Sequence, residues 1–318
     1  MLLWICLILV GVGAIVWGAE TFAEHLGKVA VGWGISAFAL ALLLAGAEPE
    51  ELATAVTAAL KQAPAIALGD VVGANIAICL VAVGVGAWLA PMPFSQRVLR
   101  YGWGGLAVGI VATAIVWDGV VERVEGAILV SLYVIYVIVI WWQEKQPPAL
   151  GELEELAKAE AQAEVLSKQS VIMDFCLVLA GVGGMVIGSI LLVEAVLQIT
   201  QVEATQTKLA LSLVGFATAF ELVVLAWSAA KRGITDATVA GVVGSFAYNV
   251  TMTLGTAAIM RPLQIVDGSL LHLPLLFMLG SLALVVVLAQ WCKSLDRGQA
   301  WVLLVSYPIF IGLMWAIG

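Results

Sequence analysis

Long apolar runs leave this chain few ways to fold. Ten segments of about 20 residues are rich in apolar side chains, and that is the length a helix needs to cross the hydrocarbon core of a membrane. They lie near 2–24, 33–60, 65–90, 99–117, 124–142, 171–197, 208–230, 236–259, 270–291 and 300–317. Because the runs are continuous rather than alternating, they predict helices and not strands. The expected fold is an all-α integral membrane protein with ten transmembrane helices.

The composition supports a membrane protein and limits the kinds of molecule that the protein is expected to bind. Of 318 residues, 63% are hydrophobic and 11% are charged, whereas soluble domains carry roughly 25% charged residues. The formal net charge of −8 comes largely from acids in the stretch 151–164 and in the apolar segments, so it carries no information on nucleic acid. The expected partners are inorganic cations and the lipid bilayer, with no nucleic acid. The sequence gives no oligomeric state.

Lysine and arginine in the loops predict the orientation, since cytoplasmic loops carry an excess of both. With the amino terminus outside, ten of these residues fall in inner loops and four in outer loops. Both termini are then outside, and the polar stretch 143–170 is a cytoplasmic acidic linker. Short loops and compact size favour a multi-pass protein of a prokaryotic inner (plasma) membrane, or of an organelle derived from one.

The chain also repeats itself. The stretch Val71–Ile78 is followed by Gly84, and the similar stretch Val242–Asn249 is followed by Gly255, at a constant offset of 171 residues. The same offset carries Glu50 onto Glu221. Residues 1–142 and 171–318 are therefore expected to form two repeats of five spans each. An odd number of spans inserts the second repeat in the opposite sense, and two inverted repeats around a midplane site are typical of secondary transporters.

Acidic residues interrupt the second apolar segment. The stretch Gly46–Glu51 reads Gly-Ala-Glu-Pro-Glu-Glu in the middle of that segment. Ionisable side chains inside a span are rare and usually face a polar cavity or a partner. Proline lacks a backbone N–H and breaks or kinks a helix. The pattern predicts a broken helix with acids at the break, which is how many transporters build an ion site.

Glu50 and Glu221 are expected to meet at the centre, one from each repeat. Carboxylates are hard oxygen ligands that suit Ca²⁺, Na⁺ or H⁺. Thr218 is expected on the helix face of Glu221, and Ser245 is expected to share a face with Asn249. Unwound backbone at 46–49 and around residue 215 is expected to contribute further oxygens through its carbonyl groups. The candidate metal ligands are Glu50, Glu221, Glu51, Glu48, Thr218, Ser245, Asn249, Asn75 and Asp70.

The paired acids suggest a mechanism. Two buried carboxylates without a cation carry an uncompensated charge that is costly to move through hydrocarbon. One divalent cation, two Na⁺ ions or two protons neutralise the pair. Only a loaded carrier is then free to change conformation, and that rule predicts obligatory exchange.

These motifs resemble those of the calcium/cation antiporter superfamily, which includes sodium/calcium and calcium/proton exchangers. The stretch 46–50 keeps the Gly and the Pro-Glu pair of the Gly-Thr-Ser-x-Pro-Glu motif, and Leu68–Ile76 looks like the Gly-Ser-Asn-Ile motif. In the second repeat, Thr218–Glu221 and Gly244–Asn249 match. The resemblance covers nearly the whole chain. It implies a secondary antiporter that exchanges Ca²⁺ for Na⁺ or H⁺ by alternating access.

Departures from the motifs leave two points open. Ala47 and Ala74 replace hydroxyl residues, Ile78 replaces an amide or acid, and Phe220 replaces a proline. The lost hydroxyls weaken Na⁺ sites and the extra acids favour proton coupling, whereas the family favours sodium, so the counter-ion stays open. The spacing to the second motif fits Glu51, whereas the Pro-Glu pair and the repeat offset favour Glu50.

Two other function classes fit some of these features. Rings of glutamate also make cation pores, so a passive cation channel is one alternative. A degenerate, non-transporting membrane protein is another, since hydroxyl ligands are missing. No GxxxxGK[ST] loop and no catalytic constellation is present in the sequence. We expect no enzyme activity and no cofactor, and Ca²⁺ with Na⁺ or H⁺ as transported substrates.

Overall fold

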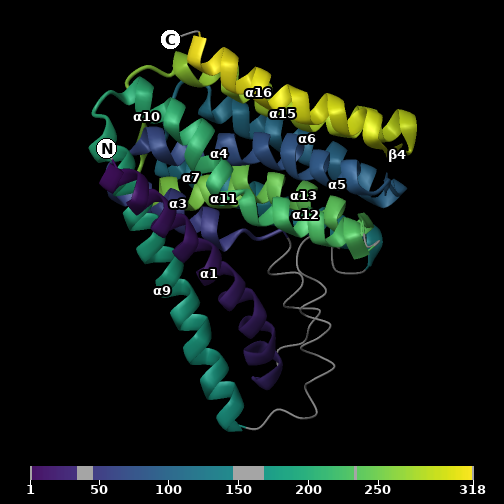
Figure 1. The fold of residues 1–318 in the computed structure, drawn as a ribbon, viewed down its shortest axis with the longest axis horizontal. Helices are drawn as coiled ribbons and strands as arrows, with labels where there is room; N and C mark the ends of the chain where they lie inside the picture. Colours follow the sequence, from purple (N-terminus) through teal and green to yellow (C-terminus); the bar gives the residue numbers. More distant parts are fainter. Residues whose placement is uncertain (1, 34–45, 146–167, 233–234, 317–318) are drawn as a thin grey trace.

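The protein is a bundle of long apolar helices (Figure 1). The computed structural model describes residues 2–33, 46–145, 168–232 and 235–316. Within these residues, nine helices are long and apolar enough to cross a membrane. The tenth expected span, 33–60, lies partly outside the described residues, as does most of the linker 143–170.

In its described residues, the first half of the chain contains seven helical elements and two short strands. They are α1 (Leu2–Gly32), α3 (Pro49–Leu60), α4 (Pro64–Ala77), the π-helical turn η1 (Ile78–Ala82), α5 (Val83–Leu89), β1 (Met92–Pro93), α6 (Gln96–Val116), β2 (Val120–Val121) and α7 (Arg123–Glu144). The strands are two residues long and lie between helices, so the apolar runs are helical as predicted.

The described elements of the second half follow, from Thr235 onward, the same order as those of the first half from Pro64 onward. They are α9 (Lys168–Ile199), α10 (Glu203–Leu209), the π-helical turn η3 (Ala210–Val214), α11 (Gly215–Thr218), α12 (Phe220–Arg232), α13 (Thr235–Tyr248), the π-helical turn η4 (Asn249–Thr253), α14 (Leu254–Met260), β3 (Leu263–Gln264), α15 (Ser269–Cys292), β4 (Ser294–Leu295) and α16 (Arg297–Ala316).

The sequence repeat is visible in the element boundaries. The run α4–η1–α5–β1 begins at Pro64, and the run α13–η4–α14–β3 begins at Thr235, 171 residues later. Every boundary along the two runs keeps this offset, including both ends of the two π-helical turns. The spans that contain these runs are also the most enclosed, 94% and 83% buried, so they form the centre of the bundle.

Two short antiparallel ladders join the halves. Strand β1 pairs with β4 through Met92 and Leu295, and β2 pairs with β3 through Val121 and Leu263. Each ladder takes one strand from each half, so the halves exchange equivalent contacts. This reciprocity is what two inverted repeats related by a pseudo-two-fold axis produce.

Helices α1 and α9 form an antiparallel pair that leaves the rest of the bundle at a steep angle (Figure 1). A Cβ atom at Gly11 would lie 2.8 Å from the carbonyl oxygen of Gly188, and one at Gly18 would lie 2.5 Å from that of Gly181. Small residues allow such close backbone approach between helices in lipid, where the hydrophobic effect gives no driving force for association.

Two polar contacts attach this pair to α3. Thr54 and Ser189 share a hydrogen bond of 3.0 Å between their hydroxyl groups, and both residues are buried. At the end of α3, Lys61 Nζ donates to Glu194 Oε2 at 2.7 Å. The paired helices are therefore tied to the helix that begins at the acidic break.

The glycines that pack between α1 and α9, which we call the glycine seam (Gly11, Gly18, Gly181 and Gly188), give a direct test. Gly18→Ala should lower the free energy of unfolding by about 1–3 kcal/mol, because the added methyl group meets backbone atoms that have no room to shift. Gly13→Ala is the matched control, since a Cβ there meets nothing within 4 Å and alanine favours the helix. The apparent melting temperature in detergent should fall for the first variant and stay level or rise for the second. Equal shifts would contradict the seam.

Candidate cation site

The predicted helix break at Gly46–Glu51 is present in its described part. Gly46 has a φ of +61°, which is unfavourable for other residues, and a Cβ atom there would lie 2.5 Å from the carbonyl carbon of Gly244. Residues 47 and 48 are not helical, and α3 begins at Pro49. Proline suits the first helical position because its missing N–H has no partner there. Glu50 and Glu51 then occupy the first turn, where the helix dipole favours negative charge.

The second repeat has an equivalent interruption at a different place from the predicted one. Gly215 was expected to be unwound, but it begins α11, and the helix is interrupted at Ala219. Phe220 begins α12, as Pro49 begins α3, and Glu221 lies in its first turn. Thr218 and Glu221 were expected on one helix face, whereas the interruption at Ala219 puts them on different helices.

Four of the acids are buried. Glu48, Glu50, Glu51 and Asp70 are 8%, 2%, 0% and 0% exposed, and Glu221 is partly buried. None of the ion pairs between described residues includes Glu48, Glu51 or Asp70. Burial of an unpaired carboxylate costs several kcal/mol, so these groups need a proton or a cation as a partner.

Glu48 is the centre of one group of acids. Its carboxyl accepts a hydrogen bond from the Ser245 hydroxyl on α13 and shares another with the carboxyl of Glu50. Glu48 also interacts electrostatically with Glu221 of the other repeat. The structure thus brings Glu48, Glu50, Glu221 and Ser245 together, and we call these four residues the central group.

Glu51 and Asp70 form a second group. The Thr218 hydroxyl donates to Asp70 Oδ1 at 3.0 Å. The carboxyl of Glu51 interacts electrostatically more strongly with Asp70 than with Glu50. Both oxygens of Glu51 and Oδ2 of Asp70 have no hydrogen-bond partner among the described residues. Glu50 and Glu51 therefore both point inward, toward different partners.

The two asparagines contact each other. Asn249 Nδ2 donates to Asn75 Oδ1 at 3.2 Å, and Asn75 Nδ2 donates to the carbonyl of Phe246 at 3.3 Å. Asn249 begins the π-helical turn η4, and such turns are frequent at functional sites. Its repeat counterpart is Ile78, which begins η1 and has no polar side chain. The amide pair therefore joins α4 to η4 through side chains from different repeat positions.

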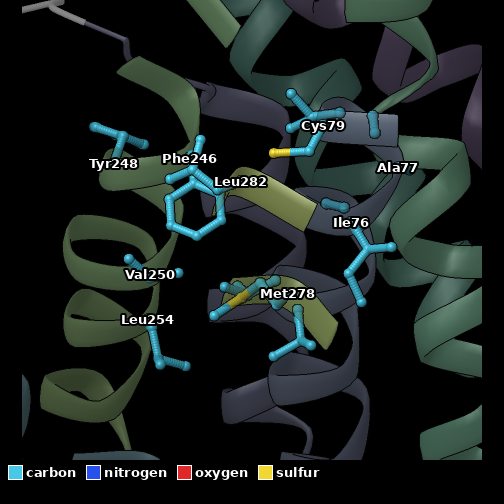
Figure 2. Close-up of a cluster of buried hydrophobic side chains, with 14 of the residues drawn as sticks. Ile76, Ala77, Cys79, Phe246, Tyr248, Val250, Leu254, Met278 and Leu282 are labelled. Carbon is cyan, nitrogen blue, oxygen red and sulfur yellow. The ribbon is translucent and has the colours of Figure 1, made fainter. Parts of the chain in front are cut away.

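Apolar side chains surround this amide pair. Figure 2 shows Phe246 of α13, Met278 and Leu282 of α15 and Ile76 of α4 gathered in one buried cluster. The amide of Asn75 also approaches Met278 Sδ at 3.8 Å. The asparagines hence satisfy each other in a dry environment.

Two tyrosines were missed by the sequence reasoning. Tyr248 interacts electrostatically with Glu48, Glu50 and Glu51, and its ring contacts that of Tyr133 edge-on at 5.3 Å between centroids. Both tyrosines are buried. A signal was available, because Tyr248 is a polar side chain inside an apolar span and directly precedes Asn249.

The geometry supports oxygen-ligand chemistry spread over two neighbouring groups. Among the residues that the structure describes, no three acidic, histidine or cysteine side chains converge closely enough to hold a metal ion by themselves. Any cation here would draw on hydroxyl, amide or carbonyl oxygens as well as on carboxylates. Hard cations such as Na⁺ and Ca²⁺ accept such mixed oxygen ligands.

Comparison with known proteins identifies the family. The sodium/calcium exchanger protein family model matches residues 3–142 and 173–316, which is most of the chain. The putative antiporter CaxA of Alkalimonas amylolytica is 22% identical, over 94% of this chain and 95% of that protein. The sodium/calcium exchanger MaX1 of Methanosarcina acetivorans is 24% identical, over 98% of both chains.

A solved structure shares the fold. The sodium-calcium exchanger NCX_Mj, soaked with Na⁺ and Sr²⁺, superimposes with a TM-score of 0.63 at 20% identity, over 98% of both chains. This likeness confirms the predicted all-helical membrane fold. On the family match, the chain belongs to the sodium/calcium exchanger protein family and is a membrane cation antiporter.

Proposed function

We propose that the protein exchanges Ca²⁺ for Na⁺ or H⁺ by alternating access, with Glu50 and Glu221 as the principal ligands. The observation that carries this proposal is the gathering of acids from both repeats at two helix breaks. Glu50 and Glu221 each lie in the first turn of a helix that starts at repeat-related positions. Glu48 connects them, since it shares a hydrogen bond with Glu50 and interacts with Glu221.

Neutral oxygens complete the proposed ligand set. The Ser245 hydroxyl already contacts Glu48, and the Thr218 hydroxyl contacts Asp70. The remaining proposed ligands, Glu51, Asn75 and Asn249, are buried on α3, α4 and η4. Ca²⁺ takes six to eight oxygens in flexible geometry, which a mixture of carboxyl, hydroxyl and carbonyl groups supplies.

Charge explains why exchange is obligatory in this proposal. A site with several buried carboxylates and no cation is costly to carry through hydrocarbon-lined intermediates. Ca²⁺, Na⁺ ions or protons remove that cost. Several buried carboxyl groups can also be neutralised by protons, which supports H⁺ as one of the two candidate counter-ions.

We also propose the membrane arrangement. Each repeat, 1–142 and 171–318, contributes five spans, with 143–170 as a cytoplasmic linker and both termini outside. The excess of lysine and arginine in the loops that are then inside supports this orientation. The relative named inner membrane protein YrbG of Escherichia coli, 23% identical over 83% of this chain, supports a prokaryotic inner membrane.

Ca²⁺ uptake into proteoliposomes tests the exchange. Wild-type protein should take up Ca²⁺ when the vesicles contain Na⁺, or when their interior is acidic, and not when neither gradient is present. Glu50→Gln and Glu221→Gln should each reduce uptake to the level of protein-free vesicles, because one missing carboxylate leaves Ca²⁺ without charge balance. Glu20→Gln is the control, since that side chain is exposed on α1. Uptake without any counter-ion gradient would instead indicate a channel.

The asparagine pair makes a separate prediction about stability. Asn249→Leu and Asn75→Leu should each lower the apparent melting temperature, at a cost of about 1–2 kcal/mol, because the first leaves Asn75 Oδ1 and the second leaves Asn249 Nδ2 buried without its partner. The double variant should cost less than the sum of the two, since no orphaned amide remains. Additive effects in this double-mutant cycle would contradict the contact.

A further inference from the structure

An apolar cavity lies where α5 meets α12 and α16. Helix α5 packs against both of the others, and the ends of α5 and α12 lie near the start of α16 at one end of the bundle (Figure 1). The cavity has a volume of about 170 Å³ and takes its lining from all three helices. Every lining side chain is aliphatic or aromatic: Val85, Trp88, Leu89, Trp227, Trp301 and Leu304.

A second cavity adjoins the first and brings charge to its end. Its volume is about 350 Å³, and it shares Trp88 and Leu89 with the apolar cavity. Arg297 also lines it, and the Nε of that side chain donates to the carbonyl of Trp88 at 3.3 Å. The apolar cavity and a guanidinium group are therefore parts of one groove, formed by the residues that line the two cavities, which we call the α5 groove.

The two helices beside α5 present their side chains in the same order along the groove. On α16, Leu304, Trp301 and Arg297 are spaced by three and four residues, so they share one helix face. On α12, Trp227 and Lys231 are four residues apart, and Lys231 Nζ lies 4.9 Å from the centroid of the Trp227 ring. Each face therefore presents a tryptophan and then, nearer the helix terminus, a cation.

This order matches the order of groups in a phospholipid, which runs from the acyl chain through the glycerol at the membrane interface to the phosphate. Tryptophan is enriched at that interface, and lysine and arginine near helix ends extend their charged groups toward it. The rings of Trp88 and Trp301 contact each other edge-on at 4.8 Å between centroids. A lipid whose chain fills the apolar cavity would therefore place its phosphate near the two cations.

The charges of the groove select among lipids. Lys231 and Arg297 are exposed, and neither belongs to an ion pair between described residues. Asp296 is the acid that lines the second cavity, and its Oδ1 accepts a hydrogen bond from the Ser294 hydroxyl at 3.2 Å. Two cations against one carboxylate leave the groove with a net positive charge. Basic pockets between transmembrane helices bind anionic lipid headgroups.

We propose that the α5 groove binds one anionic phospholipid of the surrounding membrane. An acyl chain occupies the apolar cavity lined by Trp88, Trp227 and Trp301, and the phosphate group lies beside Lys231 and Arg297. The bound lipid contacts α5, α12 and α16 together, so it stabilises the folded protein. This binding is independent of which ions the protein exchanges.

Thermal stabilisation of the full chain in a nonionic detergent tests the site. Purified, delipidated protein receives increasing mole fractions of dioleoylphosphatidylglycerol or of dioleoylphosphatidylcholine, a zwitterionic lipid with the same chains. The melting temperature should rise more with phosphatidylglycerol than with phosphatidylcholine. Soluble glycerol 1-phosphate should give no rise, because it lacks the chains that fill the cavity. Equal rises with the two lipids, or a rise with glycerol 1-phosphate equal to that with phosphatidylglycerol, would overturn the proposal.

The two cations provide the first variant. Lys231→Gln/Arg297→Gln should raise the mole fraction of phosphatidylglycerol that gives half of the maximal stabilisation by about 30-fold. That factor corresponds to about 2 kcal/mol, the contribution expected of two cations near an anionic lipid surface. Arg123→Gln/Arg261→Gln is the matched control, because it removes the same charge from two exposed residues beside β2 and β3. An equal loss in the control would assign the effect to the net charge of the protein and refute the site.

Val85→Trp tests the apolar part while both cations stay in place, and it decides the matter if the double variant does not fold. Val85 is partly exposed in the cavity lining, so a larger ring there fills the cavity without disturbing the core. The response to phosphatidylglycerol should weaken by about tenfold, because the acyl chain loses its burial there. A response of wild-type strength would mean that the lipid is held by surface charge alone, and the groove would not be its site.

Discussion

Unbalanced negative charge inside a bilayer is the constraint on which this structure depends. Glu48, Glu51 and Asp70 are buried and belong to none of the ion pairs between described residues. The protein tolerates them because helix starts and hydroxyl groups offset part of the cost. What remains must be balanced by an ion from outside, and that requirement connects the fold to cation exchange.

Backbone hydrogen bonding explains why the acids lie at helix breaks. Within hydrocarbon, only a helix satisfies its own N–H and C=O groups, so non-helical backbone is confined to positions buried in protein. The non-helical residues 46–48 meet this condition, since Gly46 packs directly on the backbone of Gly244. The second repeat has a shorter break of the same kind, in which the helix is interrupted only at Ala219, next to Phe220. Each break places the start of a helix beside a glutamate.

The extent to which the site was predictable varies from residue to residue. Pro49 and the glycine at 46 predicted the first break, because both act through local backbone geometry. The second break was predicted four residues early, since no proline marks it and Gly215 is used for close helix packing instead. The asparagines and Ser245 were identified as polar groups, but their partners were not predicted.

The sequence by itself determined the spans, the repeat with its 171-residue offset and the correspondence of Glu50 with Glu221, because hydropathy and repetition are properties of the chain order. Only the tertiary structure decided that Thr218 reaches Asp70 and that Asn75 meets Asn249. The physical reason is that contacts between segments well over 100 residues apart depend on how closely the helix backbones approach. Small residues at the packing surfaces set that distance, and no periodicity in the sequence encodes it.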